Sequence, residues 1–361
     1  MKGSFREIIS SSFEWTKTVL FKPFNLKKWL LLYVIAALAF QMQGGCNLNN
    51  PPSGGGGKSA KTSQVETKGE TVKETTESIT REPVLAGAGE AEKGGRSFMI
   101  FLIVLLVALA FLFFILLEWV YSVFSFVFIE SLVRNDASVK EPFRRNKPLG
   151  SSFFWWNIIY TTVFLGVLAV LVKLGYDALL GLGALSDGSN VALAEMFFAI
   201  LPHIIAGIFF VLIAEILSFF VSDYVLPVMY ADKAPMLTAF PRAFSLIKKD
   251  VLASVKYLFV KIGLSILITI IGGAVGMLLM LGLLIPVLLV GGLLYLLYTV
   301  VPAGFQAVYV FILVIVGMPI IVVLTFLVNA VFLPLPVFLK IFNLKFISRL
   351  DDRYNLFRAT E

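Results

Sequence analysis

Long apolar stretches constrain this chain more than any other feature of its sequence. Almost every residue from Tyr257 to Phe342 is apolar, Gly or Pro, and a second long stretch runs from Phe98 to Val133. A helix of roughly 20 apolar residues crosses the ~30 Å hydrocarbon core of a bilayer. These stretches lack the alternation of strands, and lipid offers no partner for free backbone groups. They therefore predict membrane-spanning α-helices.

The composition agrees with a membrane protein and excludes several other classes. Of 361 residues, 58% are hydrophobic and only 15% are charged, which is more apolar side chain than a soluble core of this length needs. The net charge of +7 comes from cations beside the apolar stretches, where they orient spans, so we expect no nucleic acid partner. One cysteine, Cys46, and one histidine, His203, provide neither an internal disulfide nor a Cys/His metal site.

Changes in composition divide the chain into three regions. Residues 1–43 predict an amphipathic helix in the membrane interface, over residues 4–20, followed by a short first span from Trp29 to about Gln43. Residues 44–96 are rich in Gly, Ser, Thr, Glu and Lys, with as many cations as glutamates, and predict a flexible extracytoplasmic loop. Residues 97–361 form the predicted transmembrane helical domain.

The number of crossings follows from where the cations lie. Basic segments after the second and fourth spans, and a basic C-terminal tail, favour the cytoplasm, so both termini lie inside and the number of crossings is even. Six spans are expected, and eight is the alternative. Residues 285–302 fit an external re-entrant or interfacial helix as well as a span. The expected spans after the first are 98–133, 153–174, 193–230, 257–284 and 305–338.

Two similar segments predict a repeated unit, made of a membrane helix followed by a cytoplasmic elbow. EWVYSVFSFVFIESLVRNDASVKEPFRR, from Glu118 to Arg145, resembles EILSFFVSDYVLPVMYADKAPMLTAFPR, from Glu215 to Arg242. At one constant spacing the two segments share a Glu, a Ser, an Ala, a Phe and an Arg. We interpret them as loosely repeated pairs of helices.

Each of these segments carries polar residues on one helical face. The first set follows the spacing i, i+4, i+7 and the second follows i, i+3, i+7. Ionisable groups at membrane depth usually face a bundle interior or a wet cavity, so the two sets could line a polar path. The alternative is that both glutamates lie at the inner interface and have a structural role. The candidate path residues are Glu118, Ser122, Ser125, Glu215, Ser218 and Ser222.

The cations of the elbows are the second set of candidates. A basic segment at the inner surface can bind anionic lipid, with about 1 kcal/mol for each cation near the surface. The alternative is that these cations only fix the topology. Membrane lipids, anionic ones among them, and a protein partner or a second copy of the chain are the expected partners. The candidate headgroup contacts are Arg144, Arg145, Lys147, Arg242, Lys248 and Lys249.

Three stretches carry a resemblance to known proteins: FREIISSSFEWTKTVLFKPFNLKKWLLL, VRNDASVKEPFRRNKPLGSSFFWW and SDYVLPVMYADKAPMLTAFPRAFSLI. They resemble a broad group of uncharacterised bacterial and archaeal multi-span proteins. That group is similar to the membrane domain sometimes fused to glycerophosphodiester phosphodiesterases. The resemblance implies about six helices with interfacial elbows. The soluble phosphodiesterase domain is absent from this sequence, so its activity is not implied.

The sequence thus predicts an all-α protein, a polytopic transmembrane helix bundle with interfacial amphipathic elbows in the cytoplasmic membrane. We expect no catalytic residues, no metal and no cofactor, and therefore no enzyme. The favoured function is an interaction with lipid or the scaffolding of a membrane partner. The alternative is a transporter or channel whose polar path is lined by the intramembrane glutamates.

Overall fold

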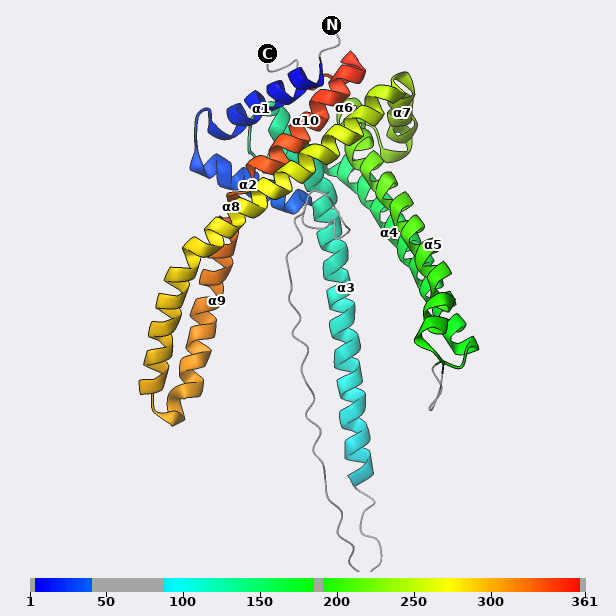
Figure 1. The fold of residues 1–361 in the computed structure, drawn as a ribbon. Coiled ribbons are helices and arrows are strands. Elements are labelled where there is room, and N and C mark those ends of the chain that lie inside the picture. Colours follow the sequence, from blue (N-terminus) through cyan, green and yellow to red (C-terminus); the bar gives the residue numbers. More distant parts are fainter. Residues whose placement is uncertain (1–3, 41–87, 185–190, 358–361) are drawn as a thin grey trace, which may run out of the picture. The chain divides into compact units, whose positions relative to one another are not determined.

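In the computed structural model the described residues, 4–40, 88–184 and 191–357, are helical almost throughout (Figure 1). Within these ranges five helices are long and apolar enough to cross a membrane. The prediction of an all-α, multi-span architecture is therefore confirmed. The described residues fall into two units, residues 88–116 and the described remainder.

The N-terminal segment forms two helices. α1 (Phe5–Phe21) begins with a capping box in which Ser4 and Glu7 bind each other's backbone N–H groups, as its Ser-x-x-Glu sequence favours. α2 (Leu26–Phe40) has 15 residues, or about 22 Å of helix, which is shorter than the hydrocarbon core. α2 is therefore not among the five long candidate spans, although the sequence predicts the first span there.

α3 (Ala88–Arg134) begins well before the predicted start near Phe98, so residues 88–96 are helical. The rest of the predicted extracytoplasmic loop, residues 44–87, lies outside the described residues. Apolar side chains from Met99 to Phe114 are exposed, whereas most of those from Tyr121 to Val133 are buried. Lipid would cover the first part, and protein covers the second.

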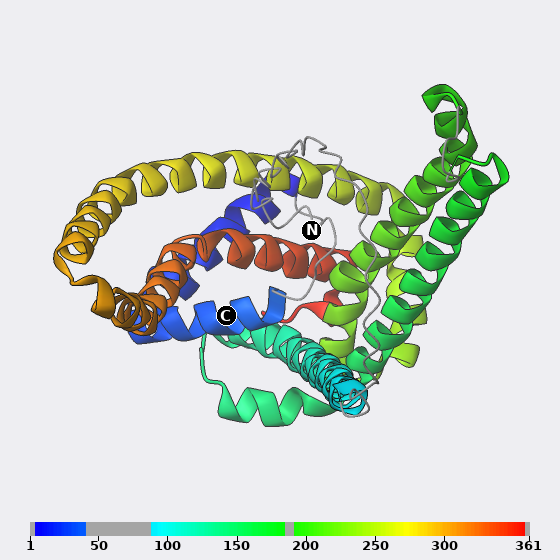
Figure 2. The same ribbon diagram turned by 90° about the horizontal axis from the view of Figure 1, so that it is seen from below.

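α4 (Lys140–Gly181) and α5 (Leu193–Phe220) lie side by side and antiparallel (Figures 1 and 2). The Tyr160 hydroxyl donates to the carbonyl of Ala214 at 2.9 Å, and the rings of Phe164 and Phe210 stack with centroids 5.4 Å apart. Short connections favour such antiparallel neighbours.

A π-helix, η1 (Val221–Val225), follows α5 directly and continues into α6 (Leu226–Asp232). A turn over 233–235 then leads to α7 (Met236–Lys249). In a π-helix one extra residue enters a helical turn, and such turns occur often at functional sites. The extra residue changes which side chains of the following turns face the protein interior.

The C-terminal region contradicts the predicted division at residue 285. α8 (Val251–Val300) is continuous, so residues 285–302 are mostly its last turns rather than a separate element. After η2 (Ala303–Phe305), α9 (Gln306–Ala330) returns beside α8, and Tyr309 donates to the Leu294 carbonyl at 2.8 Å (Figure 1). The predicted last span also ends early, because a turn over 331–333 leads into α10 (Pro334–Leu350) and η3 (Asp352–Tyr354).

The core is built where the long helices end. The end of α3, η1 with α6, and α10 supply most of its buried side chains, and α1 packs along α10. Tyr257 at the start of α8 is fully buried and stacks on Phe346, with ring centroids 4.0 Å apart. Burying each large apolar side chain contributes about 1.5–3 kcal/mol. This core positions the polar groups described next.

Candidate functional site

A buried polar cluster surrounds Asp223, which lies in the π-helix η1 and is 2% exposed. Its Oδ2 accepts a hydrogen bond from the Tyr257 hydroxyl at 2.7 Å and lies 2.5 Å from Lys261 Nζ. The side-chain amide of Asn343 donates to the Asp223 carbonyl at 2.8 Å and to the Tyr257 oxygen at 3.0 Å. We call these four residues, with Lys340, the π-helix cluster.

The π-helix cluster connects three elements and carries an excess of positive charge. Asp223 comes from η1, Tyr257 and Lys261 from α8, and Asn343 and Lys340 from α10. Lys340 Nζ donates to the Ser222 carbonyl at 3.1 Å. Burial lowers the pKa of Lys340 to about 8, with Asp223 raising it and Lys261 lowering it further. One carboxylate thus faces two ammonium groups.

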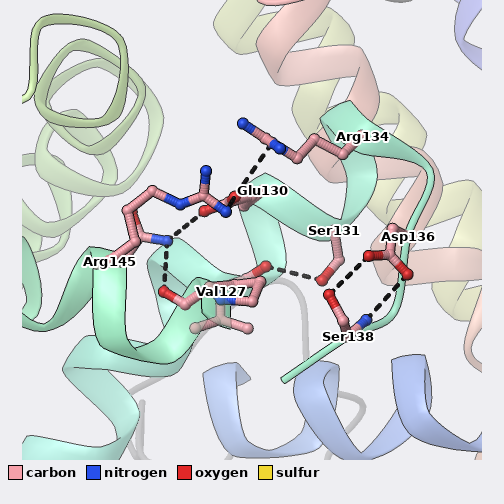
Figure 3. Close-up of polar contacts among 9 residues, drawn as sticks. Val127, Glu130, Ser131, Arg134, Asp136, Ser138 and Arg145 are labelled. Carbon is pink, nitrogen blue, oxygen red and sulfur yellow. Dashed lines mark hydrogen bonds and ion pairs between the residues drawn. The ribbon is translucent and has the colours of Figure 1, made fainter. Parts of the chain in front are cut away.

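A second polar cluster closes the first elbow. Glu130 of α3 is 1% exposed, and its Oε1 lies 2.8 Å from the Arg145 guanidinium and 3.1 Å from that of Arg134 (Figure 3). Its Oε2 accepts a hydrogen bond from Asn146 at 2.5 Å. Charged and hydrogen-bonded partners offset the cost of burying this carboxylate. We call Glu130, Arg134, Arg145 and Asn146 the elbow cluster.

The predicted polar path is only partly assembled. Asn157 of α4 donates to Glu118 at 2.9 Å and to Ser122 at 3.4 Å, whereas Ser125 binds the Tyr121 carbonyl of its own helix. All three predicted path residues of α3 therefore have a hydrogen-bond partner.

On α5, Glu215 is half-buried and close enough to Tyr160 of α4 to interact electrostatically. Ser222 contributes its carbonyl to the π-helix cluster, and Ser218 is half-buried. Two residues of α4 that are one turn apart, Asn157 and Tyr160, therefore lie near the glutamates of α3 and α5.

Three ionisable residues lie at a similar place along their helices. Glu118, Glu215 and Lys261 each lie where a long helix changes from packed core to exposed apolar surface. This position favours the interfacial interpretation of the glutamates, because a charge at that level can reach polar headgroups.

The six predicted headgroup contacts divide into two groups. Three of them pair with carboxylates: Arg145 with Glu130, Arg242 with Asp232, and Lys249 with Asp351. The pair with Lys249, and the backbone N–H of Arg353, lower the pKa of Asp351.

The other three predicted contacts are exposed. Lys147 lies over the Trp119 ring and Lys248 over the Phe244 ring, at 5.7 and 4.9 Å from the ring centroids. Arg144 has no ion pair with any residue that the structure describes. Solvent or lipid headgroups can therefore reach these three cations most easily.

The two similar segments have several structural features in common. Both have a residue with positive φ after the helix, Asn135 at 54° and Lys233 at 52°, and a backbone bond across that turn. In both, the shared Phe packs on an aromatic ring of the preceding helix, and the shared Arg binds a buried carboxylate. The spacing between the two turns is one residue longer than that between Glu118 and Glu215, which fits the extra residue of η1.

The residues predicted from the sequence do not include Asp223, Tyr257, Lys261, Lys340 or Asn343. A usable signal was present, because Asp223 and Lys261 interrupt apolar stretches, and ionisable residues there have a partner or a function by default. Their pairing could not be predicted from a local pattern, because 38 positions separate Asp223 from Lys261 and 120 separate Asp223 from Asn343. Among the described residues no group of His, Cys, Asp and Glu could hold a metal ion.

Comparison with known proteins identifies a family for this chain but no function. No curated protein and no solved structure matches the chain. One family model does match, over residues 6–357, and its description is a family of unknown function, DUF7544. Because the match covers nearly the whole chain, the protein belongs to the DUF7544 family.

Proposed function

We propose that this protein is a non-enzymatic component of the cytoplasmic membrane that binds anionic lipids on its cytoplasmic side. Both termini lie in the cytoplasm in this proposal, and the packed core of elbow helices lies at the inner headgroup level. The resemblance to the membrane domain of glycerophosphodiester phosphodiesterases supports a role in the membrane.

The main support for the proposal is that α7 has one face buried in the core and an opposite face that is exposed and apolar. One face buries Met236, Ala239, Ala243 and Leu246 in the core. The opposite face exposes Leu237, Pro241, Phe244 and Lys248, which follow the spacing i, i+4, i+7, i+11. An exposed apolar stripe that ends in a cation is typical of a helix lying in the membrane interface.

Neighbouring segments have the same combination of exposed apolar residues and cations. Phe13, Phe21 and Phe24 are 60%, 49% and 60% exposed, beside Lys17 and Lys22. Since membrane spans precede and follow the elbows, lipid is the occupant available to cover these residues.

A lipid-selectivity measurement tests the proposal. In bilayers with spin-labelled lipids, the wild-type protein should immobilise phosphatidylglycerol in preference to phosphatidylcholine. Lys147→Glu with Lys248→Glu should lower that preference, because each lost cation removes about 1 kcal/mol and each new carboxylate adds repulsion.

Lys173→Glu is the matched control, because Lys173 is exposed and lies far along α4 from the elbow. The control should retain the wild-type preference. Equal immobilisation of both lipids by the wild-type protein would exclude anionic-lipid binding and leave the exposed stripe of α7 to a protein partner.

A transporter or channel is the second candidate, and the arrangement around α4 supports it. Asn157 faces Glu118, and Tyr160, one turn later, lies near Glu215. In this proposal the polar groups of α3, α4 and α5 line a common path. Substrate flux into vesicles that is lost in Glu118→Gln and Glu215→Gln would favour it over lipid binding alone.

A further inference from the structure

The cations around the elbow cluster outnumber the carboxylates that hold them. Glu130 holds both Arg134 and Arg145, while its second oxygen is occupied by Asn146. The two arginine side chains remain 56% and 41% exposed, so guanidinium N–H groups that Glu130 does not engage are open to solvent. The buried carboxylate fixes their position and leaves donors free.

Lys233 adds a further positive charge to this region. Its Nζ lies 3.8 Å from the centroid of the Tyr230 ring. Burial lowers the pKa of Lys233, the Glu130 carboxylate raises it, and the charges of Arg145 and Arg134 lower it again. Three cations are therefore close enough to Glu130 to share its single charge.

A surface hollow opens beside these cations at the start of α4. It has a volume of about 440 Å³ and is lined by Glu141, Arg144 and Arg145. This volume is within the roughly 300–1,000 Å³ that small-molecule sites occupy. Arg144 has no ion-pair partner among the described residues, so its guanidinium is available to a ligand in the hollow.

The first turn of α4 favours an anion as well. The residue before it, Val139, provides no side-chain cap, so the N–H groups of Lys140 and Glu141 lack that partner; Pro142 has no N–H, and that of Phe143 donates to the Val139 carbonyl. Unpaired N–H groups and the helix dipole both attract negative charge. Glu141 is the one carboxylate in the lining, and it opposes an anion there.

We propose that this hollow is a phosphate-binding site in which Arg144 and Arg145 contact the ligand and Glu130 positions Arg145. Guanidinium groups match phosphate oxygens with paired, charge-assisted hydrogen bonds, which a single ammonium group does not provide. The phosphate can belong to a lipid headgroup or to a soluble phosphorylated molecule. Only the lipid source depends on the lipid-binding function proposed above.

Two binding measurements on the full-length protein test the site. In the first, the protein in phosphatidylcholine nanodiscs is titrated with inorganic phosphate by calorimetry. Arg144→Gln should weaken binding about tenfold, since a hydrogen bond to a charged group contributes about 1.5–3 kcal/mol. Glu141→Gln should strengthen binding, because it removes the opposing charge. Both side chains are exposed, so both variants should fold.

In the second measurement, nanodiscs contain phosphatidic acid, and its retention by the protein is measured by native mass spectrometry. Lys256→Gln is the control in both measurements, because Lys256 is an exposed cation on α8 outside the hollow. Dependence on Arg144 for phosphatidic acid alone identifies a lipid ligand. The same dependence for inorganic phosphate alone identifies a soluble one.

Equal binding by wild type, Arg144→Gln and Glu141→Gln in both measurements would overturn the proposed site. That result is distinct from failure of the proposed function, which is tested at Lys147 and Lys248 outside the hollow. Loss of lipid preference there, with phosphate binding still dependent on Arg144, would support both proposals. Phosphate binding without any lipid preference in the wild-type protein would support the site alone.

Discussion

The two lysines around Asp223 differ in how well their burial is compensated. Removing a carboxylate and an ammonium group from water costs several kcal/mol each, and their attraction repays that cost only when the geometry is good. Lys261 has such geometry, with Nζ 2.5 Å from the Asp223 carboxylate. Lys340 does not, because its hydrogen bond goes to a backbone carbonyl.

Lys340 should therefore destabilise the protein at neutral pH. Its pKa is about 8 in the folded state and 10.5 in the unfolded chain, so between these values only the unfolded chain holds the proton. The contribution of Lys340 to stability thus rises with pH from 8 to 10.5. Lys340→Met should unfold at a higher temperature than wild type at pH 7, by an amount equivalent to roughly 1–3 kcal/mol.

The difference between Lys340→Met and wild type should shrink as pH approaches 10.5. Thermal unfolding in detergent at several pH values measures it. Lys256→Met is the control and should leave the stability unchanged, because Lys256 is an exposed lysine near the start of α8. A Lys340→Met variant that is less stable than wild type at pH 7 would contradict the prediction.

Helix packing in the core depends on one close approach between α3 and α4. Gly150 of α4 is buried against Val123 of α3. A Cβ atom added at Gly150 would lie 2.5 Å from Val123 Cγ2 and 2.6 Å from Val123 Cα. The side chain could rotate away, but the backbone cannot move without separating the helices.

Gly150→Ala should therefore destabilise the protein by about 3 kcal/mol, the upper end of the usual cost of overpacking. Gly166→Ala is the matched control on the same helix, because nothing lies within 4 Å of its added Cβ. It should be neutral or stabilising by up to ~1 kcal/mol, since Ala favours helix over Gly. Chemical or thermal unfolding of both variants in the same detergent measures the difference, and equal stabilities would show that α3 and α4 do not meet at Gly150.

Periodicity and composition predicted the elements better than their ends. The apolar stretches predicted helices because each stretch contains its own signal. The end of a span has a weaker signal, so the sequence divided α8 at residue 285, although Pro286 lies inside a continuous helix. The π-helix η1 was not predicted either, because its extra residue is accommodated by packing of Asp223 against α8 and α10, far away in sequence.

The candidate sites show the same limit for the molecule as a whole. The six candidate cations were chosen because they lie near the ends of predicted spans. In the structure three of them lie near the start of α4 and three in α7. Which of them are free could not be predicted, because Arg145, Arg242 and Lys249 bind carboxylates that other parts of the chain provide. Sequence alone thus locates a basic surface, and only the fold divides it into structural and available charges.

We propose a topology from the five long helices and the positions of the basic elbows. With the C-terminal tail in the cytoplasm, the connections of the two helix hairpins, α4 with α5 and α8 with α9, lie outside. An N-terminus in the cytoplasm then requires an even number of crossings. In the proposed topology the sixth crossing comes from the segment that contains α2, whose 15 residues are fewer than a full span needs.

Cysteine labelling in a Cys46→Ser background tests this topology. Asp177→Cys and Gly304→Cys, near the two hairpin connections, should react with an impermeant maleimide in intact cells. Ser10→Cys and Lys256→Cys should react only after the membrane is opened, because the proposed topology places α1 and the start of α8 in the cytoplasm. All four positions are exposed, so burial does not block the reagent. Labelling of Ser10→Cys in intact cells, with Lys256→Cys protected, would place α1 outside and reduce the crossings to five.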